Sequence, residues 1–153
     1  MPPPIFFYRT TDPYGSLSNF SKHRIWLDGK LWLTAEHYFQ AQKFAGTEHE
    51  ESVRMCPTAR EAANMGRERT RPLRPDWPAV RDDVMRRALH AKFTQHPSLR
   101  AELLSTGTAA LIEHTANDRY WADGGDGTGE NKLGHLLMEL REKLRTESAR
   151  DVG

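Results

Sequence analysis

One acidic residue, Glu36, lies where the sequence predicts the start of a helix. Thr34 is a suitable N-cap for a helix that runs through Phe44 and ends at Gly46, because its hydroxyl can accept from an orphan backbone N–H. The positive end of a helix macrodipole favours an ionised carboxylate in the first turn. Glu36 therefore suits a general base or an electrostatic stabiliser. A first-turn glutamate that only stabilises its own helix is the commoner case, and the spacing alone leaves that alternative open.

A second candidate is the segment Asp118 to Asn131, which carries four glycines and three aspartates between an expected strand and an expected helix. Glycine allows a backbone to approach a ligand closely, and the N–H groups at the start of the next helix can receive a phosphate or a sugar hydroxyl. This composition indicates a ligand-binding loop, with an ordinary connection as the alternative. No Gly-Lys-Ser/Thr motif closes it as a P-loop, and its acidic spacing does not fit an EF-hand. A weak divalent site on Asp123 and Asp126 remains open.

Aromatic and basic residues could supply further contacts to a ligand. Trp77 and Trp121 could stack on a heterocyclic base, although tryptophan is more often a core residue. Arginine binds phosphate through paired hydrogen bonds, and we expect most of the arginines in the middle of the chain to lie on a solvated face instead. These arginines are Arg54, Arg60, Arg67, Arg69, Arg71, Arg74, Arg81, Arg86 and Arg87.

The sequence lacks the motifs that several other kinds of chemistry require. The seven histidines form no HExxH motif, and Cys56 is the single cysteine, so the sequence predicts no zinc site and no disulfide. There is no GxSxG motif, which argues against a serine hydrolase of that type. We expect no metal and no organic cofactor.

The elements that must position these residues follow from local signals. Asp28-Gly29 between two apolar halves predicts a type I′ hairpin over residues 25–33, and short strands are expected at Ile5 to Tyr8 and at Ala110 to Glu113. Helices are expected in four further places: from Thr58 to Gly66, from Asp76 through Ala91, from Pro97 to Gly107, and along the leucine stripe from Leu133 to Leu144. The fold class is therefore α+β, mostly helical with a small β component.

Length and charge limit the remaining possibilities. The 153 residues fit a single domain over residues 1–153, and 22 basic against 21 acidic residues give a formal charge of +1. This charge argues against a strongly basic nucleic-acid-binding scaffold. The chain contains no run of 18 apolar residues, and the proline-rich stretch Met1 to Tyr8 is too short for a secretory signal. We expect a soluble, cytoplasmic protein that does not contact a membrane; the sequence leaves its oligomeric state open.

Taken together, the motifs resemble those of the NADAR (YbiA-like) family, in order and over nearly the whole chain. The matching pieces are Gly15 to Phe20, Glu36 to Gln40 with Lys43-Phe44, Thr58-Ala59, Gly66-Arg67, Arg74 to Trp77, Val80-Arg81, Val84-Met85, Ala91 to Phe93, Leu103-Leu104, Glu113, Asp118, Trp121, Asp123-Gly124 and Gly129 to Met138. One departure is Ala122, where many relatives have glycine.

This resemblance implies a YbiA-like fold and N-glycosidase chemistry, the hydrolysis of a ribose C–N bond. Implied substrates are phosphorylated riboflavin-pathway intermediates or ADP-ribose attached to guanine in nucleic acid, which would make the chain antitoxin-like. Catalysis is implied on Glu36, with Trp77 and Asp118 in the same pocket. Residues implied to line the substrate site are Gly15, Ser16, Asn19, Phe20, Trp121, Asp123, Gly124, Gly129 and Asn131, while residue type alone suggests Arg67, Arg81 and Lys92 for a phosphate.

The implied chemistry agrees with the residues themselves. Breaking a ribosyl C–N bond passes through a cation-like sugar, which a fixed carboxylate stabilises while it accepts a proton from water. Near-neutral charge favours a small substrate over nucleic acid. The alternative from a different class is a module that binds ADP-ribose or a nucleotide without cleaving it.

Overall fold

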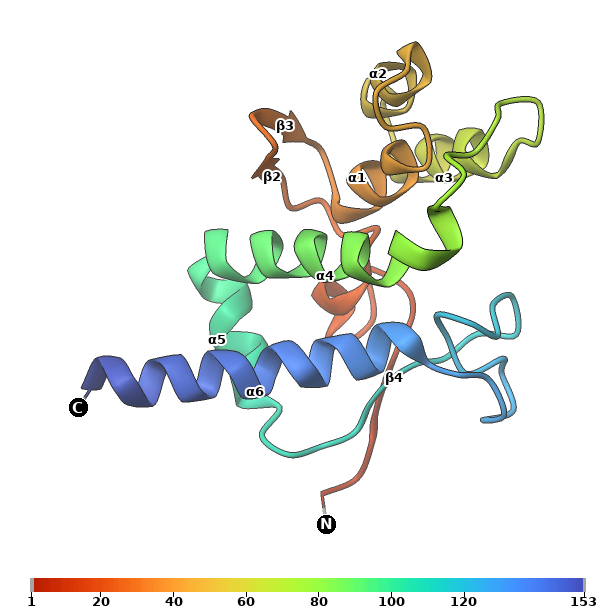
Figure 1. Ribbon diagram of the computed structural model, residues 1–153. Coiled ribbons are helices and arrows are strands. Elements are labelled where there is room, and N and C mark those ends of the chain that lie inside the picture. The colour runs from red at the N-terminus through yellow and green to blue at the C-terminus, as the bar shows by residue number, and fades with distance from the viewer. Residues whose placement is uncertain (1, 153) are drawn as a thin grey trace. The chain divides into compact units, whose positions relative to one another are not determined.

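The computed structural model describes residues 2–152 and has the expected α+β composition, with short strands and mostly helical structure (Figure 1). The chain divides into two compact units. One unit is Asn19–Gln95, and the other combines the residues up to Ser18 with those from His96 onward. Each unit is described by itself.

In the unit Asn19–Gln95, strands β2 (Ile25–Leu27) and β3 (Lys30–Trp32) form the predicted antiparallel hairpin. Asp28 and Gly29 both have positive φ, 55° and 77°, which confirms the predicted turn. The carboxylate of Asp28 accepts a hydrogen bond of 2.8 Å from the Tyr38 hydroxyl and pairs with Arg87. The turn is thus held to two helices of the same unit.

Helix α1 (Ala35–Gln42) begins where the sequence predicts, with the Thr34 hydroxyl accepting from the His37 backbone N–H at 3.1 Å. All eight residues of α1 are buried, because α2, α3, α4 and β3 contact it from different sides (Figure 1). Burial on every side explains why α1 carries buried polar residues with no solvent-facing stripe. The helix ends four residues before Gly46, whose φ is 82°.

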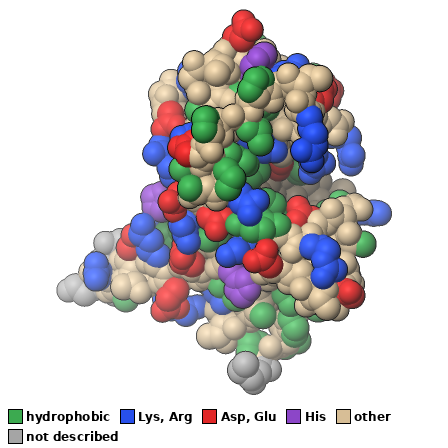
Figure 2. Space-filling view, turned by 45° about the vertical axis from the view of Figure 1, so that its right-hand side comes forward, with side chains coloured by type: hydrophobic (Ala, Val, Ile, Leu, Met, Phe, Trp, Pro, Cys, Tyr) green, Lys and Arg blue, Asp and Glu red, His purple; other side chains and the backbone are tan. Residues whose placement is uncertain are grey.

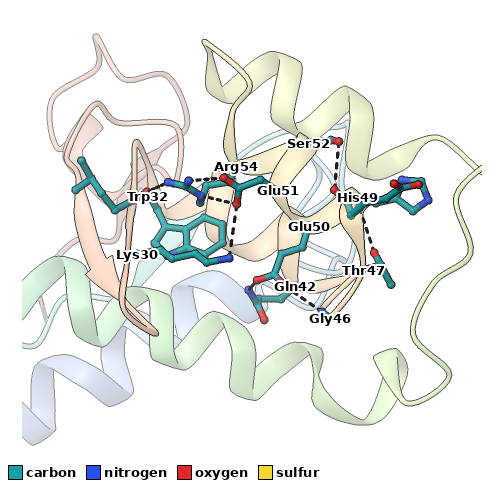
Figure 3. Close-up of polar contacts among 12 residues, drawn as sticks. Lys30, Trp32, Gln42, Gly46, Thr47, His49, Glu50, Glu51, Ser52 and Arg54 are labelled. Atoms are coloured by element: carbon teal, nitrogen blue, oxygen red, sulfur yellow. Dashed lines mark hydrogen bonds and ion pairs between the residues drawn. The ribbon is translucent and has the colours of Figure 1, made fainter.

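Helix α2 (Glu48–Arg54) was not predicted from the sequence. It is short and polar, and only Val53 is buried, so it shows no apolar periodicity. Its start signal is local: Thr47 caps the helix by accepting from the His49 N–H at 3.2 Å. Figure 3 shows how it is held, with Lys30 pairing with Glu51 at 3.6 Å. Arg54 also donates to the Leu31 carbonyl at 3.0 Å.

Helices α3 (Ala59–Arg67) and α4 (Trp77–Gln95) complete this unit. Thr58 caps α3 by accepting from the Glu61 N–H at 3.1 Å, as its spacing predicts. The prediction that Gly66 closes α3 was wrong. Gly66 lies within the last turn and is buried, since it packs against Gln40 of α1 instead of ending the helix. The helix α4 begins after Asp76 as expected, although the Asp76 carboxylate pairs with Arg74 at 2.6 Å.

In the other unit, β1 (Ile5–Phe7) pairs with β4 (Leu111–Glu113) in parallel. A short 3₁₀ helix, η1 (Gly15–Leu17), precedes α5 (Pro97–Ser105) and α6 (Lys132–Val152) in the chain. The leucines of α6 predicted as an apolar stripe are buried: Leu133, Leu136, Leu137, Leu140 and Leu144.

The distribution of charged side chains agrees with the near-neutral formal charge. Figure 2 shows basic and acidic side chains interspersed over the visible face. Among residues 2–152, no helix is long and apolar enough to cross a membrane.

Cys56 is buried, and burial raises the pKa of its thiol.

Candidate active site

Glu36 occupies the first turn of α1 and is buried, with 6% of its surface exposed. Its backbone N–H donates to the Asn19 carbonyl at 3.2 Å, which ties the segment before the hairpin to the start of the helix. A buried carboxylate requires hydrogen bonds or opposite charge. Two neighbours in the same unit supply these features: Gln40 donates a hydrogen bond to the carboxylate, and Lys43 brings a positive charge within electrostatic range.

Gln40 follows Glu36 by one helical turn and is 3% exposed. Its Nε2 donates to Glu36 Oε1 at 2.8 Å, and its Oε1 has no hydrogen-bond partner within the described part of the chain. The amide packs on Gly66 of α3. A Cβ added at Gly66 would lie 2.8 Å from Gln40 Cδ and closer still to Oε1, so α3 can approach α1 here only because residue 66 is glycine.

Asn19, whose backbone carbonyl accepts from the Glu36 N–H, also carries an unsatisfied side-chain acceptor. Its side chain is 7% exposed, and its Nδ2 donates to the sulfur of Met85 at 3.2 Å. Among residues 2–152, no donor reaches Asn19 Oδ1. Buried acceptors are usually paired, so this oxygen is suited to a ligand hydroxyl or N–H.

Lys43 is the residue that the sequence analysis failed to assign. It lies two turns after Glu36, its Nζ donates to the Gly66 carbonyl at 3.3 Å and lies 5.8 Å from the Phe39 ring. Burial lowers the pKa of Lys43 to about 8, the Glu36 carboxylate opposes this shift, and Arg67 adds to it. Lys43 therefore lies within electrostatic range of both Glu36 and Arg67. Its spacing of seven residues from Glu36, which places both on one helix face, was the signal available in the sequence.

His37 has a structural role although it follows Glu36 directly. Its ring is fully buried; Nε2 donates to the Cys56 carbonyl at 2.9 Å, and Nδ1 lies 2.7 Å from the Thr34 hydroxyl. Burial lowers the pKa of His37, and the hydrogen bond to Cys56 only partly opposes this. A neutral ring that donates through Nε2 and accepts at Nδ1 satisfies both contacts.

Trp77, the first residue of α4, is 6% exposed and packs against Phe39 of α1, with ring centroids 5.2 Å apart. Phe39 is itself the ring over which Lys43 lies. The aromatic pair thus belongs to the same side of α1 as the Lys43 ammonium. Trp77 is a core residue by burial, as is usual for tryptophan.

The three cations expected to bind phosphate differ in exposure. Arg67 is exposed at the end of α3, and Arg81 is partly buried. Lys92 is fully buried, and its Nζ lies 5.2 Å from the ring of Phe93. Of the three, Arg67 is the one whose charge acts on Lys43.

Within its own unit, the predicted loop is organised by its acidic residues. Asp118 Oδ1 accepts from the backbone N–H groups of Tyr120 and Trp121, both at 2.8 Å. The Tyr120 and Trp121 rings meet edge to face at 4.9 Å. Trp121 is partly exposed.

Asp123 is 4% exposed and stabilises the loop from inside. It accepts from the N–H groups of Thr115 at 3.1 Å and Gly125 at 2.8 Å, and His114 Nδ1 lies 2.6 Å from Oδ2. Burial opposes ionisation, but these hydrogen bonds outweigh it, so the pKa of the Asp123 carboxyl lies below its ordinary value. Gly124, with φ of 74°, packs on the Arg119 side chain.

Asn131 and Gly129 join this loop to β4 and α6. Asn131 accepts from the Glu113 N–H at 3.0 Å and donates to the Leu111 carbonyl at 2.9 Å. A Cβ added at Gly129 would lie 2.5 Å from the Ala122 carbonyl oxygen, so this position also requires glycine. Ala122 is fully buried. The contacts of Asn131 and Gly129 are thus internal to the loop and its supports.

The remaining predicted residues lie close in sequence to residues 18 and 19, where one unit ends and the other begins. Gly15 is buried, with its N–H donating to the Asp12 carbonyl at 2.8 Å, and the Ser16 hydroxyl bonds the Glu102 carboxylate of α5. Phe20 is partly exposed.

The structure brings some predicted residues together within a unit. Glu36, Asn19, Arg67 and Trp77 belong to the unit Asn19–Gln95, where Gln40, Gly66 and Lys43 join them. Asp118, Trp121, Asp123, Gly124, Gly129 and Asn131 belong to the other unit, together with Gly15 and Ser16.

No group of three or more His, Cys, Asp or Glu in the described ranges could hold a metal ion. Asp126 accepts from the Thr128 N–H at 3.0 Å, and Asp123 is bonded within the loop. The divalent site left open for these two aspartates gains no support.

Comparisons with known proteins agree over nearly the whole chain. The NADAR domain model matches residues 6–145. N-glycosidase YbiA of Escherichia coli (strain K12) is 56% identical over 143 residues, which cover 94% of this chain and 89% of that protein. The NMR structure of the E. coli protein YbiA superposes with a TM-score of 0.89 at 54% identity, covering 96% of this chain and 88% of that one.

More distant relatives carry two kinds of name. N-glycosidase Npun_R5314 of Nostoc punctiforme is 42% identical, with 92% of each chain covered. The riboflavin biosynthesis protein VVA0006 of Vibrio vulnificus is 41% identical over 95% of this chain, but the match spans only 40% of that protein.

Proposed function

The chain belongs to the NADAR domain family, and from this premise we propose that it is an N-glycosidase that hydrolyses the ribose C–N bond of a phosphorylated intermediate of riboflavin biosynthesis. The observation that carries the proposal is the buried Glu36 carboxylate, which accepts a hydrogen bond from Gln40 and lies within electrostatic range of Lys43 in its own unit.

The reaction needs few chemical parts. As the C–N bond breaks, its electron pair goes to the leaving nitrogen and positive charge develops on the ribose. The Glu36 carboxylate stabilises that charge and accepts a proton from the attacking water, whose oxygen forms the new bond to the anomeric carbon. The proton then reaches the leaving nitrogen. No metal or organic cofactor enters this scheme.

The surroundings of Glu36 suit a phosphorylated sugar. Asn19 Oδ1 is a buried acceptor for a ribose hydroxyl. Lys43 and Arg67 supply positive charge for a phosphate. The role that the family resemblance implies for the buried Trp77 stays a prediction. Arg81 and Lys92 have less support, because Arg81 is partly buried and Lys92 is fully buried.

The names of relatives favour the small substrate. Two relatives named as riboflavin biosynthesis proteins match this chain over 95% and 92% of its length, and these matches span 40% and 25% of those longer proteins. The formal charge of +1 agrees with a small ligand better than with nucleic acid. The roles that the family resemblance implies for Asp118 and Trp121 stay predictions.

Incubation with three substrates tests the proposal. Wild type, Glu36→Ala and Glu36→Gln are mixed with a phosphoribosylamino-pyrimidine, with DNA containing ADP-ribosylated guanine, and with free ADP-ribose, and release of base or ribose is followed. We expect wild type to cleave the first substrate and both variants to lose at least about a hundredfold in kcat while remaining folded. Glu61→Gln is the matched control, because Glu61 is exposed in the capping box of α3.

Equal turnover by wild type and the Glu36 variants would defeat the role of Glu36. Cleavage of the modified DNA alone would replace the small substrate by ADP-ribosylguanine. Tight binding without turnover of any substrate would instead identify a non-catalytic ADP-ribose or nucleotide-binding module.

A further inference from the structure

We propose that Gln40, wedged against Gly66, is a positioning residue that holds the Glu36 carboxylate in its working orientation. The inference rests on the proposed N-glycosidase function. It adds a residue that contacts the catalytic carboxylate and not the substrate.

The geometry of α1 makes this contact direct. Glu36 and Gln40 are four residues apart, so their side chains lie on the same face of the helix. The bond from Gln40 Nε2 to Glu36 Oε1 is 2.8 Å long, and both side chains are at least nine-tenths buried. A hydrogen bond to an ionised carboxylate in such surroundings is stronger than one between neutral groups. It therefore favours both the ionised form of Glu36 and one orientation of its carboxylate.

Gly66 leaves room for the Gln40 amide, and the Glu36 carboxylate determines which way the amide faces. The missing Cβ leaves room for the amide between α1 and α3, with Gln40 Oε1 against residue 66 and Nε2 toward Glu36. The opposite orientation would place two oxygen acceptors together. The chosen orientation leaves Gln40 Oε1 unpaired among residues 2–152, an unfavourable arrangement that needs a compensating interaction. The charge-assisted bond to Glu36 supplies that compensation.

The test compares two buried glutamines of the same helix. Gln40→Met removes the donor at nearly constant volume. Gln42→Met is the matched control, since Gln42 is 7% exposed and donates to Glu50 at 3.1 Å, in the α1–α2 contact drawn in Figure 3. Steady-state kinetics on the phosphoribosylamino-pyrimidine are measured for both from pH 5 to about pH 9, with stability measured in parallel.

For Gln40→Met we expect kcat to fall about 10- to 100-fold with KM within about twofold, and the acid limb of the kcat/KM profile to move to higher pH. Gln42→Met keeps the wild-type kcat and profile. Equal behaviour of the two variants overturns the inference, because both losses would then be structural. A raised KM with unchanged kcat also overturns it, since Gln40 would then bind substrate.

Gln40→Glu provides a second variant of the same shape. It places another carboxyl beside Glu36, and two adjacent carboxyls do not both ionise readily, so the acid limb again moves to higher pH. A profile that superposes on wild type would contradict the proposed contact.

A measurement without substrate separates this inference from the proposed function. The side-chain amide protons of Gln40 are followed by NMR from pH 3 to about pH 8 in wild type and in Glu36→Gln. We expect a carboxyl titration that is seen in wild type and lost in the variant, whether or not any substrate is cleaved. No titration in wild type overturns the positioning role, while absent turnover with the titration present overturns the proposed function alone.

Discussion

At the residue scale, Lys43 shows how position changes the properties of a common side chain. Its seven-residue spacing from Glu36 says nothing of its burial, yet burial lowers its pKa to about 8 and its charge acts on Glu36. The cause is the packing of α3 on α1, which surrounds the Lys43 stem and brings Gly66 and Arg67 to its end. A lysine with this pKa is largely protonated at neutral pH and loses its charge under mildly alkaline conditions.

The lowered pKa of Lys43 predicts that the folded protein becomes more stable as pH rises above about 8. The unfolded chain holds the Lys43 proton up to its ordinary pKa of about 10.4, whereas the folded chain releases it near 8, so the unfolded state binds more protons between these values. The free energy of unfolding should therefore gain a favourable contribution as pH rises from about 8 to about 10. Urea unfolding of wild type and Lys43→Met at several pH values measures it. Parallel pH curves for the two proteins would contradict the prediction, because Lys43→Met lacks this proton.

Asp118 provides a second prediction at this scale. Its Oδ1 accepts from two backbone N–H groups, a role that an asparagine oxygen also performs. If the carboxylate charge acts in hydrolysis, Asp118→Asn should lose about tenfold or more in kcat while its thermal unfolding stays close to wild type. Circular dichroism and the substrate assay are the two measurements. Wild-type kinetics in the folded variant would leave Asp118 a purely structural residue.

At the scale of elements, α3 and α1 approach closely at one glycine. Alanine in place of a helical glycine ordinarily gains about 1 kcal/mol from helix propensity. At Gly66 the added Cβ would overlap the Gln40 amide, and overpacking of a buried contact costs about 1–3 kcal/mol. The steric effect is the larger of the two when the neighbour cannot move away, as for a side chain that is 3% exposed.

We therefore predict that Gly66→Ala lowers the free energy of unfolding by about 1 kcal/mol or more, despite its better helix propensity. Asn64→Ala in the same helix is the control, because Asn64 is exposed and the change should be neutral or slightly stabilising. Chemical denaturation of the three proteins gives the comparison. A stabilised Gly66→Ala would mean that α3 shifts away from Gln40 without loss.

Elements were predictable where their signals are local. The Thr34 and Thr58 caps and the Asp28-Gly29 turn act within a few residues, and each lies where the sequence places it. The helix α2 was missed because it is short and polar and has no apolar periodicity, although Thr47 and the first-turn glutamates Glu48, Glu50 and Glu51 mark its start. Gly66 was misread as a helix end because a glycine that ends a helix and one that permits close packing look the same in a sequence.

At the scale of the whole molecule, charge limits the class of substrate. Basic and acidic side chains are balanced in number, and the visible face in Figure 2 mixes them. Proteins that bind DNA without sequence preference do so through many phosphate contacts, with dissociation constants of about 1–100 µM and a steep dependence on salt. This chain lacks the net charge for such binding.

We predict that unmodified duplex DNA binds with a dissociation constant weaker than about 100 µM at physiological salt. Fluorescence anisotropy with a labelled duplex at low and physiological ionic strength tests this, with the phosphoribosylamino-pyrimidine as a competitor. Micromolar binding that weakens steeply with salt would instead favour ADP-ribosylated nucleic acid as the substrate class.

The sequence by itself determined the fold class, the family and the identity of the candidate carboxylate. Periodicity, caps and turn residues are short-range properties. The order of motifs along the chain can likewise be seen without a three-dimensional structure. The tertiary structure decided what surrounds that carboxylate. Gln40 and Gly66 are 26 positions apart in numbering but in contact in space, and Lys43 acquires its lowered pKa only when α3 covers it. Desolvation and close packing depend on which surfaces meet, and local sequence does not encode that meeting.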